Sequence, residues 1–101
     1  MATTAKIKIK ELPGVALYKH WDGYPEATLP WLESFNKRFT KERGNDPEYK
    51  MAQLIRSSAF DCNEFNLDPS RSTGWGVITK KAQYVTDYEY VLLEDGTVKV
   101  N

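Results

Sequence analysis

The sequence is short of cysteine, histidine, net charge and long apolar runs, and each shortage excludes a class of protein. The single cysteine, Cys62, has no partner for an internal disulfide, which is typical of a reducing compartment. The 14 basic and 14 acidic side chains cancel, so the overall charge does not support nucleic-acid binding. No apolar run approaches the roughly 20 residues of a membrane span, and residues 1–6 lack the apolar core of a signal peptide. We therefore expect a cytoplasmic protein that does not enter a membrane.

What the chain does have is enough apolar and aromatic side chains to build one hydrophobic core. Of its 101 residues, 41% are hydrophobic and 13% are aromatic. At this length folding removes roughly 60–65% of the surface of the unfolded chain, without help from disulfides. We therefore expect residues 1–101 to form a single domain, and no pattern in the sequence indicates a bound cofactor.

Alternating side chains predict two strands near the start of the chain. In residues 6–10 lysine alternates strictly with isoleucine, which is the period of a half-buried strand. Residues 15–21 follow a Pro-Gly turn and predict a second strand. Because side chains alternate along a strand, Tyr18 and His20 should share one face of the sheet, with Trp21 on the opposite face.

Two helices are predicted next. Thr28 is a suitable N-cap for the first helix, and Gly44 ends it. Asp46 and Pro47 form the N-cap and first position of the second helix. The apolar positions recur at helical spacing, and the residues expected to share one core are Leu29, Leu32, Phe35, Phe39, Leu54 and Ile55.

The last third of the chain predicts strands again. Residues 64–67 alternate weakly, residues 75–79 and 88–93 are rich in aromatic and β-branched residues, and a Gly-containing turn leads to residues 97–100. The predicted order is β-β-α-α-(β)-β-β-β. Helices grouped between strands favour a two-layer α+β fold, with both helices packed on one face of an antiparallel sheet.

The side chains best suited to catalysis or metal binding lie where the second predicted strand ends. His20 and Asp22 could form half of a metal site, or a general base with its orienting carboxylate. A metal site needs three or four ligands, and no further ligands follow in a recognised spacing. The alternative is structural: His20 makes a buried hydrogen bond, and Asp22 caps the turn before Gly23.

Four more residues complete the predicted site. Trp21 and Tyr24 could stack on a base or sugar, or could close the seam between the sheet and the first helix. Lys19 precedes the histidine as a point charge for an anion. Arg56, near the end of the second helix, could assist or could simply satisfy carbonyls at the helix end.

The run Tyr18-Lys19-His20-Trp21-Asp22-Gly23-Tyr24-Pro25-Glu26 resembles the signature of a small family of uncharacterised proteins encoded by phages, bacteria and archaea. That signature has the form Tyr-basic-His-Trp-Asp-Gly-Tyr-Pro-Glu, and Lys19 stands where arginine is common. The resemblance continues at residues 46–49 and 88–90. The family has no established activity, so the resemblance implies a fold and a site but no reaction.

Three functions are compatible with these observations. The leading hypothesis is a non-catalytic binding or interaction module of phage origin. Its partner would be an unidentified small molecule or protein, and its site would comprise Lys19, His20, Trp21, Asp22, Tyr24 and Arg56. The second is a small enzyme that acts on a nucleotide or phosphoester with His20 as general base. The third is a structural subunit of a homo-oligomer, paired through an edge strand.

Overall fold

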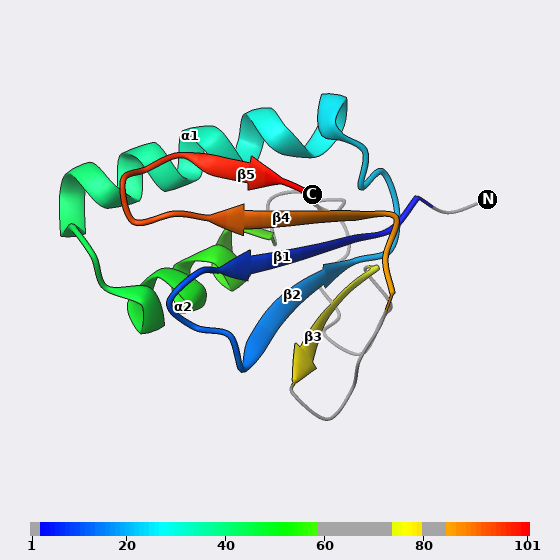
Figure 1. Cartoon of the computed structure of the whole chain (residues 1–101), viewed down its shortest axis with the longest axis horizontal. Helices are drawn as coiled ribbons and strands as arrows, with labels where there is room; N and C mark the ends of the chain where they lie inside the picture. Colours follow the sequence, from blue (N-terminus) through cyan, green and yellow to red (C-terminus); the bar gives the residue numbers. More distant parts are fainter. Residues whose placement is uncertain (1–2, 59–73, 80–84) are drawn as a thin grey trace.

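Two helices cover one face of a five-stranded sheet, and no helix of the described residues covers the other face (Figure 1). The computed structural model describes residues 3–58, 74–79 and 85–101. The predicted two-layer α+β fold is confirmed. In chain order the elements are β1 (Ala5–Ile9), β2 (Val15–Lys19), α1 (Pro25–Arg43), α2 (Pro47–Ser58), β3 (Trp75–Thr79), β4 (Tyr88–Leu92) and β5 (Val98–Val100).

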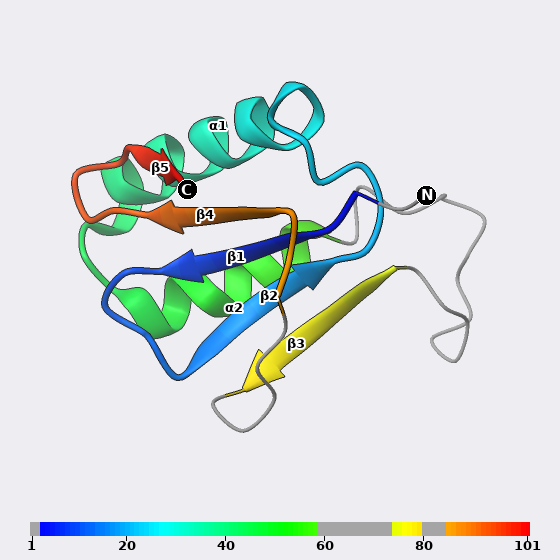
Figure 2. The same cartoon turned by 45° about the vertical axis from the view of Figure 1, so that its right-hand side comes forward.

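The sheet has the order β3-β2-β1-β4-β5, so the first strand of the chain lies at its centre. Three of the pairings are antiparallel, and the fourth, between β1 and β4, is parallel. Parallel neighbours need a long connection, which the chain supplies with β2, both helices and β3. Figure 2 shows the result: α1 lies along β4 and β5, and α2 lies behind β1 and β2.

The core lies between the sheet and the two helices. The three apolar residues of β1 are fully buried, whereas the two lysines between them are partly exposed, as the alternation predicted. In the sheet register Ile7 lies opposite Leu17 on one side and Tyr90 on the other. The buried core cluster consists of Ala5, Ile7, Ile9, Leu17, Leu32, Met51, Leu54, Tyr90 and Leu92.

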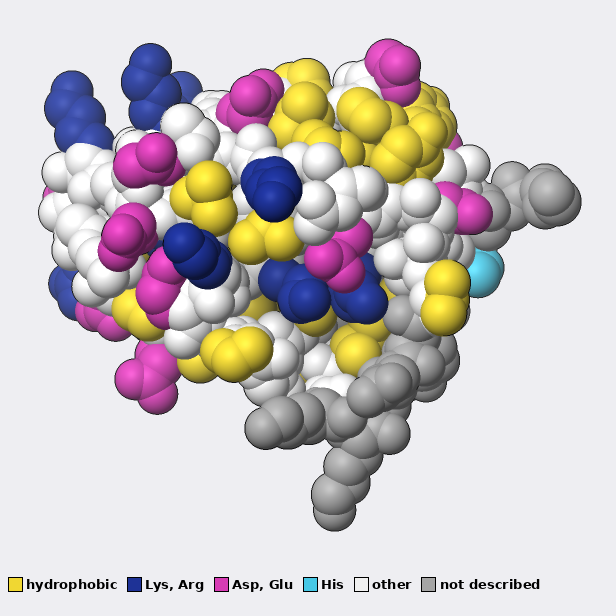
Figure 3. All heavy atoms as spheres, viewed as in Figure 1, with side chains coloured by type: hydrophobic (Ala, Val, Ile, Leu, Met, Phe, Trp, Pro, Cys, Tyr) yellow, Lys and Arg dark blue, Asp and Glu magenta, His cyan; other side chains and the backbone are white. Residues whose placement is uncertain are grey.

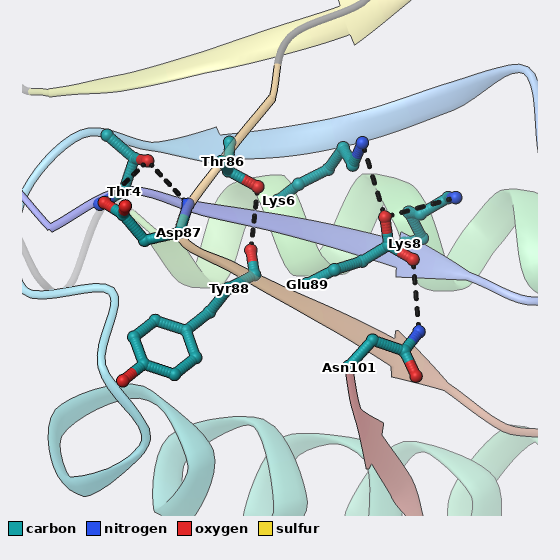
Figure 4. A network of polar contacts seen from close by, with 8 residues as sticks. All are labelled: Thr4, Lys6, Lys8, Thr86, Asp87, Tyr88, Glu89 and Asn101. Carbon is teal, nitrogen blue, oxygen red and sulfur yellow. Dashed lines mark hydrogen bonds and ion pairs between the residues drawn. The ribbon is translucent and has the colours of Figure 1, made fainter.

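The face of the sheet away from the helices carries charged side chains at its centre (Figure 3). Glu89 lies 3.3 Å from Nζ of Lys6 and 3.6 Å from Nζ of Lys8, and it accepts a hydrogen bond from Asn101 (Figure 4). Partial burial raises the pKa of Glu89, but Asn101 and the two lysines outweigh burial and hold the pKa below its ordinary value. These contacts tie β1 to β4 across the parallel pair.

Helix α1 begins one turn earlier than the sequence predicted. Its N-cap residue is Tyr24, which makes no side-chain cap bond, and Pro25 occupies the first helical position. The fixed φ of proline suits that position, so the helix starts there without a hydroxyl cap. Thr28 is fully buried inside the first turn, and its hydroxyl donates to the carbonyl of Asp22 at 2.9 Å. The predicted Thr28 cap was therefore wrong.

Helix α2 begins as predicted, because the Asp46 carboxylate accepts from the backbone N–H of Tyr49 at 3.4 Å. The prediction that Ile55 lies in the core was wrong, since this side chain is 40% exposed. It follows the buried Leu54 in the chain, and a step of one residue turns the helix surface by about 100° away from the sheet. Leu29 and Phe35 are partly buried against the core, and Phe39 is 8% exposed.

Some predictions fall outside the described residues, namely the strand at residues 64–67 and any role of Cys62. Strand β2 ends at Lys19, two residues before the predicted end. Within the described parts of the chain, no helix has the length and apolar character needed to cross a membrane.

Candidate functional site

The predicted site forms a corner at the end of β2, defined here as residues 18–24. A hydrogen bond of 2.8 Å joins the Tyr18 hydroxyl to Nδ1 of His20. The prediction that these two side chains share a face is confirmed. The same contact changes the expected chemistry, because Tyr18 rather than Asp22 is the hydrogen-bond partner of His20. Asp22 has a φ of 55°, so the chain leaves the extended conformation before the carboxylate could line up with the ring.

Trp21 lies against His20, although the two side chains were predicted to lie on opposite faces of the sheet. Its ring meets the His20 ring edge-on, with the ring centroids 5.0 Å apart and an interplanar angle of 74°. Strict alternation ends with β2 at Lys19, which explains the difference. The indole also covers Gly74, where any added Cβ would collide with it, and the Gly74 carbonyl accepts from the His20 backbone N–H at 2.8 Å. The corner therefore holds the segment that enters β3.

The backbone at Gly23 is the most constrained part of the corner. Its N–H donates to the Thr3 carbonyl at 2.8 Å, and its carbonyl accepts from the buried Tyr90 hydroxyl at 2.6 Å. A Cβ at this position would lie 2.7 Å from the carbonyl carbon of Thr4 and 2.9 Å from the backbone nitrogen of Ala5. Burial raises the pKa of Tyr90 to about 12, so this hydroxyl stays a donor at neutral pH.

The other predicted site residues lie apart from the contacts made by His20, Trp21 and Gly23. Lys19 is 7% exposed on the helix side of the sheet, and its Nζ lies 4.6 Å from the centroid of the Trp75 ring. Tyr24 is 38% exposed at the start of α1. Arg56 is exposed on α2, and no hydrogen bond or ion pair joins it to the corner among the described residues. Nor do the described residues contain a group of three histidine, cysteine or acidic side chains that could hold a metal.

A second candidate site, which the sequence analysis did not identify, is a groove between α1 and α2. Its volume is about 610 Å3. Its aromatic residues repeat every fourth position on α1 and face a tyrosine on α2, a signal that the sequence analysis assigned to the core alone. We call it the interhelical groove, and its lining residues are Trp31, Ser34, Phe35, Arg38, Phe39, Glu42, Arg43, Tyr49, Gln53 and Ser57.

Aromatic rings in contact with one another line the interhelical groove. The Phe35 and Phe39 rings stack with centroids 6.1 Å apart, and Tyr49 meets Phe39 edge-on at 5.8 Å. At one end of the groove Trp31 donates its indole N–H to the Ser57 hydroxyl at 2.8 Å, which ties the two helices together. These contacts fix the rings in place, so the groove is formed without a ligand.

The rim of the groove carries two arginines and one acid. The guanidinium of Arg43 lies 4.1 Å from the centroid of the Tyr49 ring and 3.3 Å from a carboxylate oxygen of Asp46. Arg38 is exposed and makes no ion pair or hydrogen bond with the described residues. Glu42 is the one acidic residue among the lining residues, and Asp46 balances the charge of Arg43.

A lysine is buried behind the groove. Lys50 has no exposed surface, its Nζ lies 5.5 Å from the centroid of the Phe39 ring, and this nitrogen has no hydrogen-bond partner among the described residues. Burial lowers the pKa of Lys50, and the nearby charge of Glu11 offsets part of that effect.

Comparison with known proteins adds no family to this description. No protein-family model matches the sequence, and no curated protein and no solved structure matches it. The resemblance based on the signature at residues 18–26 therefore stays a prediction.

Proposed function

We propose that the protein is a non-catalytic binding module whose ligand occupies the interhelical groove. The supporting observation is the groove itself, since its volume of about 610 Å3 lies within the roughly 300–1,000 Å3 of small-ligand sites. Its lining combines aromatic rings with a few polar and charged groups, which is the composition of such sites. A cytoplasmic location and a phage origin remain part of this proposal.

The contacts of the corner support a structural role for the signature. Trp21 and Gly23 contact other parts of the chain, at Gly74 and Thr3 respectively, and Tyr18 holds the ring of its near neighbour His20. The enzyme hypothesis relied on Asp22 to orient His20, whereas the observed partner is Tyr18. These contacts therefore favour a structural role over catalysis at the corner.

The three tryptophans give a direct test of this proposal. Trp31 lines the groove, Trp21 belongs to the corner, and Trp75 lies in β3, so their indole N–H resonances report on three separate places. We expect that, in a metabolite panel followed by two-dimensional NMR, compounds that bind will shift the Trp31 resonance and leave that of Trp21 in place. Shifts at Trp21 alone would instead assign binding to the corner, and a panel without any shift at Trp31 would contradict the proposal.

A further inference from the structure

The charges at the rim of the interhelical groove indicate the class of ligand. Arg38 stands at the rim with no ion pair or hydrogen bond to the described residues, although Glu42, one turn further along α1, also lines the groove. Arg43 is already held by Tyr49 and by Asp46. One guanidinium is therefore prepositioned, and the other is available to an incoming anion. Guanidinium groups bind carboxylates and phosphates through paired hydrogen bonds.

The aromatic rings of the groove indicate a second property of the ligand, namely a planar ring. Phe35, Phe39 and Tyr49 present aromatic faces and edges, and aromatic pairs are favourable at centroid separations of about 4.5–7 Å. Tyr49 is 36% exposed, so part of its side chain is in contact with solvent, while Arg43 lies over its ring. A flat ring in the groove would bury apolar surface that is now in contact with water.

The size of the groove and the charges at its rim together limit the class of ligand that can bind there. A stable protein partner needs roughly 800 Å2 of surface on each side, far more than the ten lining residues of this groove are expected to offer. Glu42 also lines the groove and disfavours a ligand with several anionic groups, because like charges repel. From these observations we infer that the groove binds a small planar aromatic molecule with a single anionic group, with Arg38 as its anion-binding residue. This inference depends on the proposed function.

The inference is tested with four probes, namely 2-naphthoate, 2-naphthalenemethanol, adenosine monophosphate and inorganic phosphate. We expect 2-naphthoate to shift the Trp31 indole resonance in a saturable manner and to bind at least tenfold more tightly than the neutral alcohol. Inorganic phosphate alone should leave Trp31 unchanged, because it has no ring. Tighter binding of adenosine monophosphate than of 2-naphthoate would identify the anion as a phosphate, and the reverse order would identify it as a carboxylate.

The matched variants are Arg38→Gln and Lys41→Gln. Both remove one exposed cation from the second half of α1, but only Arg38 lines the groove. We expect Arg38→Gln to weaken 2-naphthoate about tenfold and Lys41→Gln to weaken it less than twofold, with an unchanged spectrum for the free protein in both. Equal affinities for the acid and the alcohol, or equal effects of the two variants, would overturn the inference and leave groove binding intact. If neither compound shifts Trp31, the inference is wrong; the proposed function then depends on the metabolite panel alone.

Discussion

The corner at the end of β2 and the interhelical groove differ in what their polar groups contact. In the corner, His20, Gly23 and Tyr90 each have a hydrogen-bond partner between 2.6 and 2.8 Å away. In the groove, Arg38 makes no ion pair or hydrogen bond with the described residues. The buried side-chain atoms without a partner among those residues belong to neither region, and they are Glu11 Oε1, Asn36 Oδ1, Thr40 Oγ1 and Lys50 Nζ.

Under the proposed function, this difference separates a structural region from a binding region. A buried polar atom without a partner costs free energy, as does an exposed aromatic ring, and such departures persist where function requires them. Lys50 lies behind the groove with such an atom, and Tyr49 in the groove is 36% exposed. In the corner, however, Trp21 is 51% exposed and Tyr24 is 38% exposed, so exposed rings alone do not separate the two regions. Under the proposed function, the contacts of the corner with Thr3, Gly74 and Tyr90 give the signature a structural role, and the aromatic positions of α1 and α2 form the binding site.

The largest expected effect is that of Gly23→Ala in the corner. The new methyl group would meet the backbone of Thr4 and Ala5, which has no freedom to move within the sheet. Such overpacking costs about 3 kcal/mol, which urea unfolding would measure. Gly14→Ala is the matched control, since a Cβ there has no neighbour within 4 Å. If the two variants had the same urea midpoint, the corner would not be the rigid region described here.

The next effect is that of Tyr90→Phe, which removes the hydrogen bond to the Gly23 carbonyl. A buried carbonyl left without its donor costs about 1–2 kcal/mol. The same residue makes stability depend on pH. Because its pKa is raised from 10.0 to about 12 in the folded protein, the folded state holds the proton more tightly, and stability falls as the pH rises through this range. The Phe variant should lack this alkaline loss in urea unfolding. An equal alkaline loss in both proteins would assign the effect to another group.

The features that could be predicted from the sequence are those set by residues close together in the chain, whereas contacts between distant residues could not be predicted. The alternation of β1 and the Asp46 cap of α2 are local, and both were predicted correctly. The parallel pairing of β1 with β4 brings together residues more than 80 positions apart, and no periodicity specifies strand direction. The Tyr18–His20 contact follows from alternation within one strand, whereas the interhelical groove depends on how far apart two helices pack.

A smaller effect, of the opposite sign, is expected from Lys50→Met beside the groove. The lowered pKa of Lys50 means that burial disfavours the ammonium ion in the folded state. That cost is fully present below the folded-state pKa and disappears as the pH rises toward 10.5, the ordinary lysine value. We expect the Met variant to gain about 1 kcal/mol at neutral pH, since an apolar side chain has no charge to desolvate. A loss of stability in urea unfolding at pH 7 would show that Lys50 is satisfied within the fold.

The smallest effect on stability, and the sharpest separation of the two regions, is expected from Tyr49→Ser. Tyr49 is 36% exposed in the groove and Tyr24 is 38% exposed in the corner, so Tyr24→Ser is its matched control. Each change should alter the free energy of unfolding by less than about 1 kcal/mol, as is usual for exposed positions. Only Tyr49→Ser should abolish the response of the Trp31 resonance to 2-naphthoate, because Tyr49 contributes a partly exposed ring to the lining of the groove and supports Arg43. If Tyr24→Ser abolished that response and Tyr49→Ser preserved it, the roles assigned to the corner and the groove would be reversed.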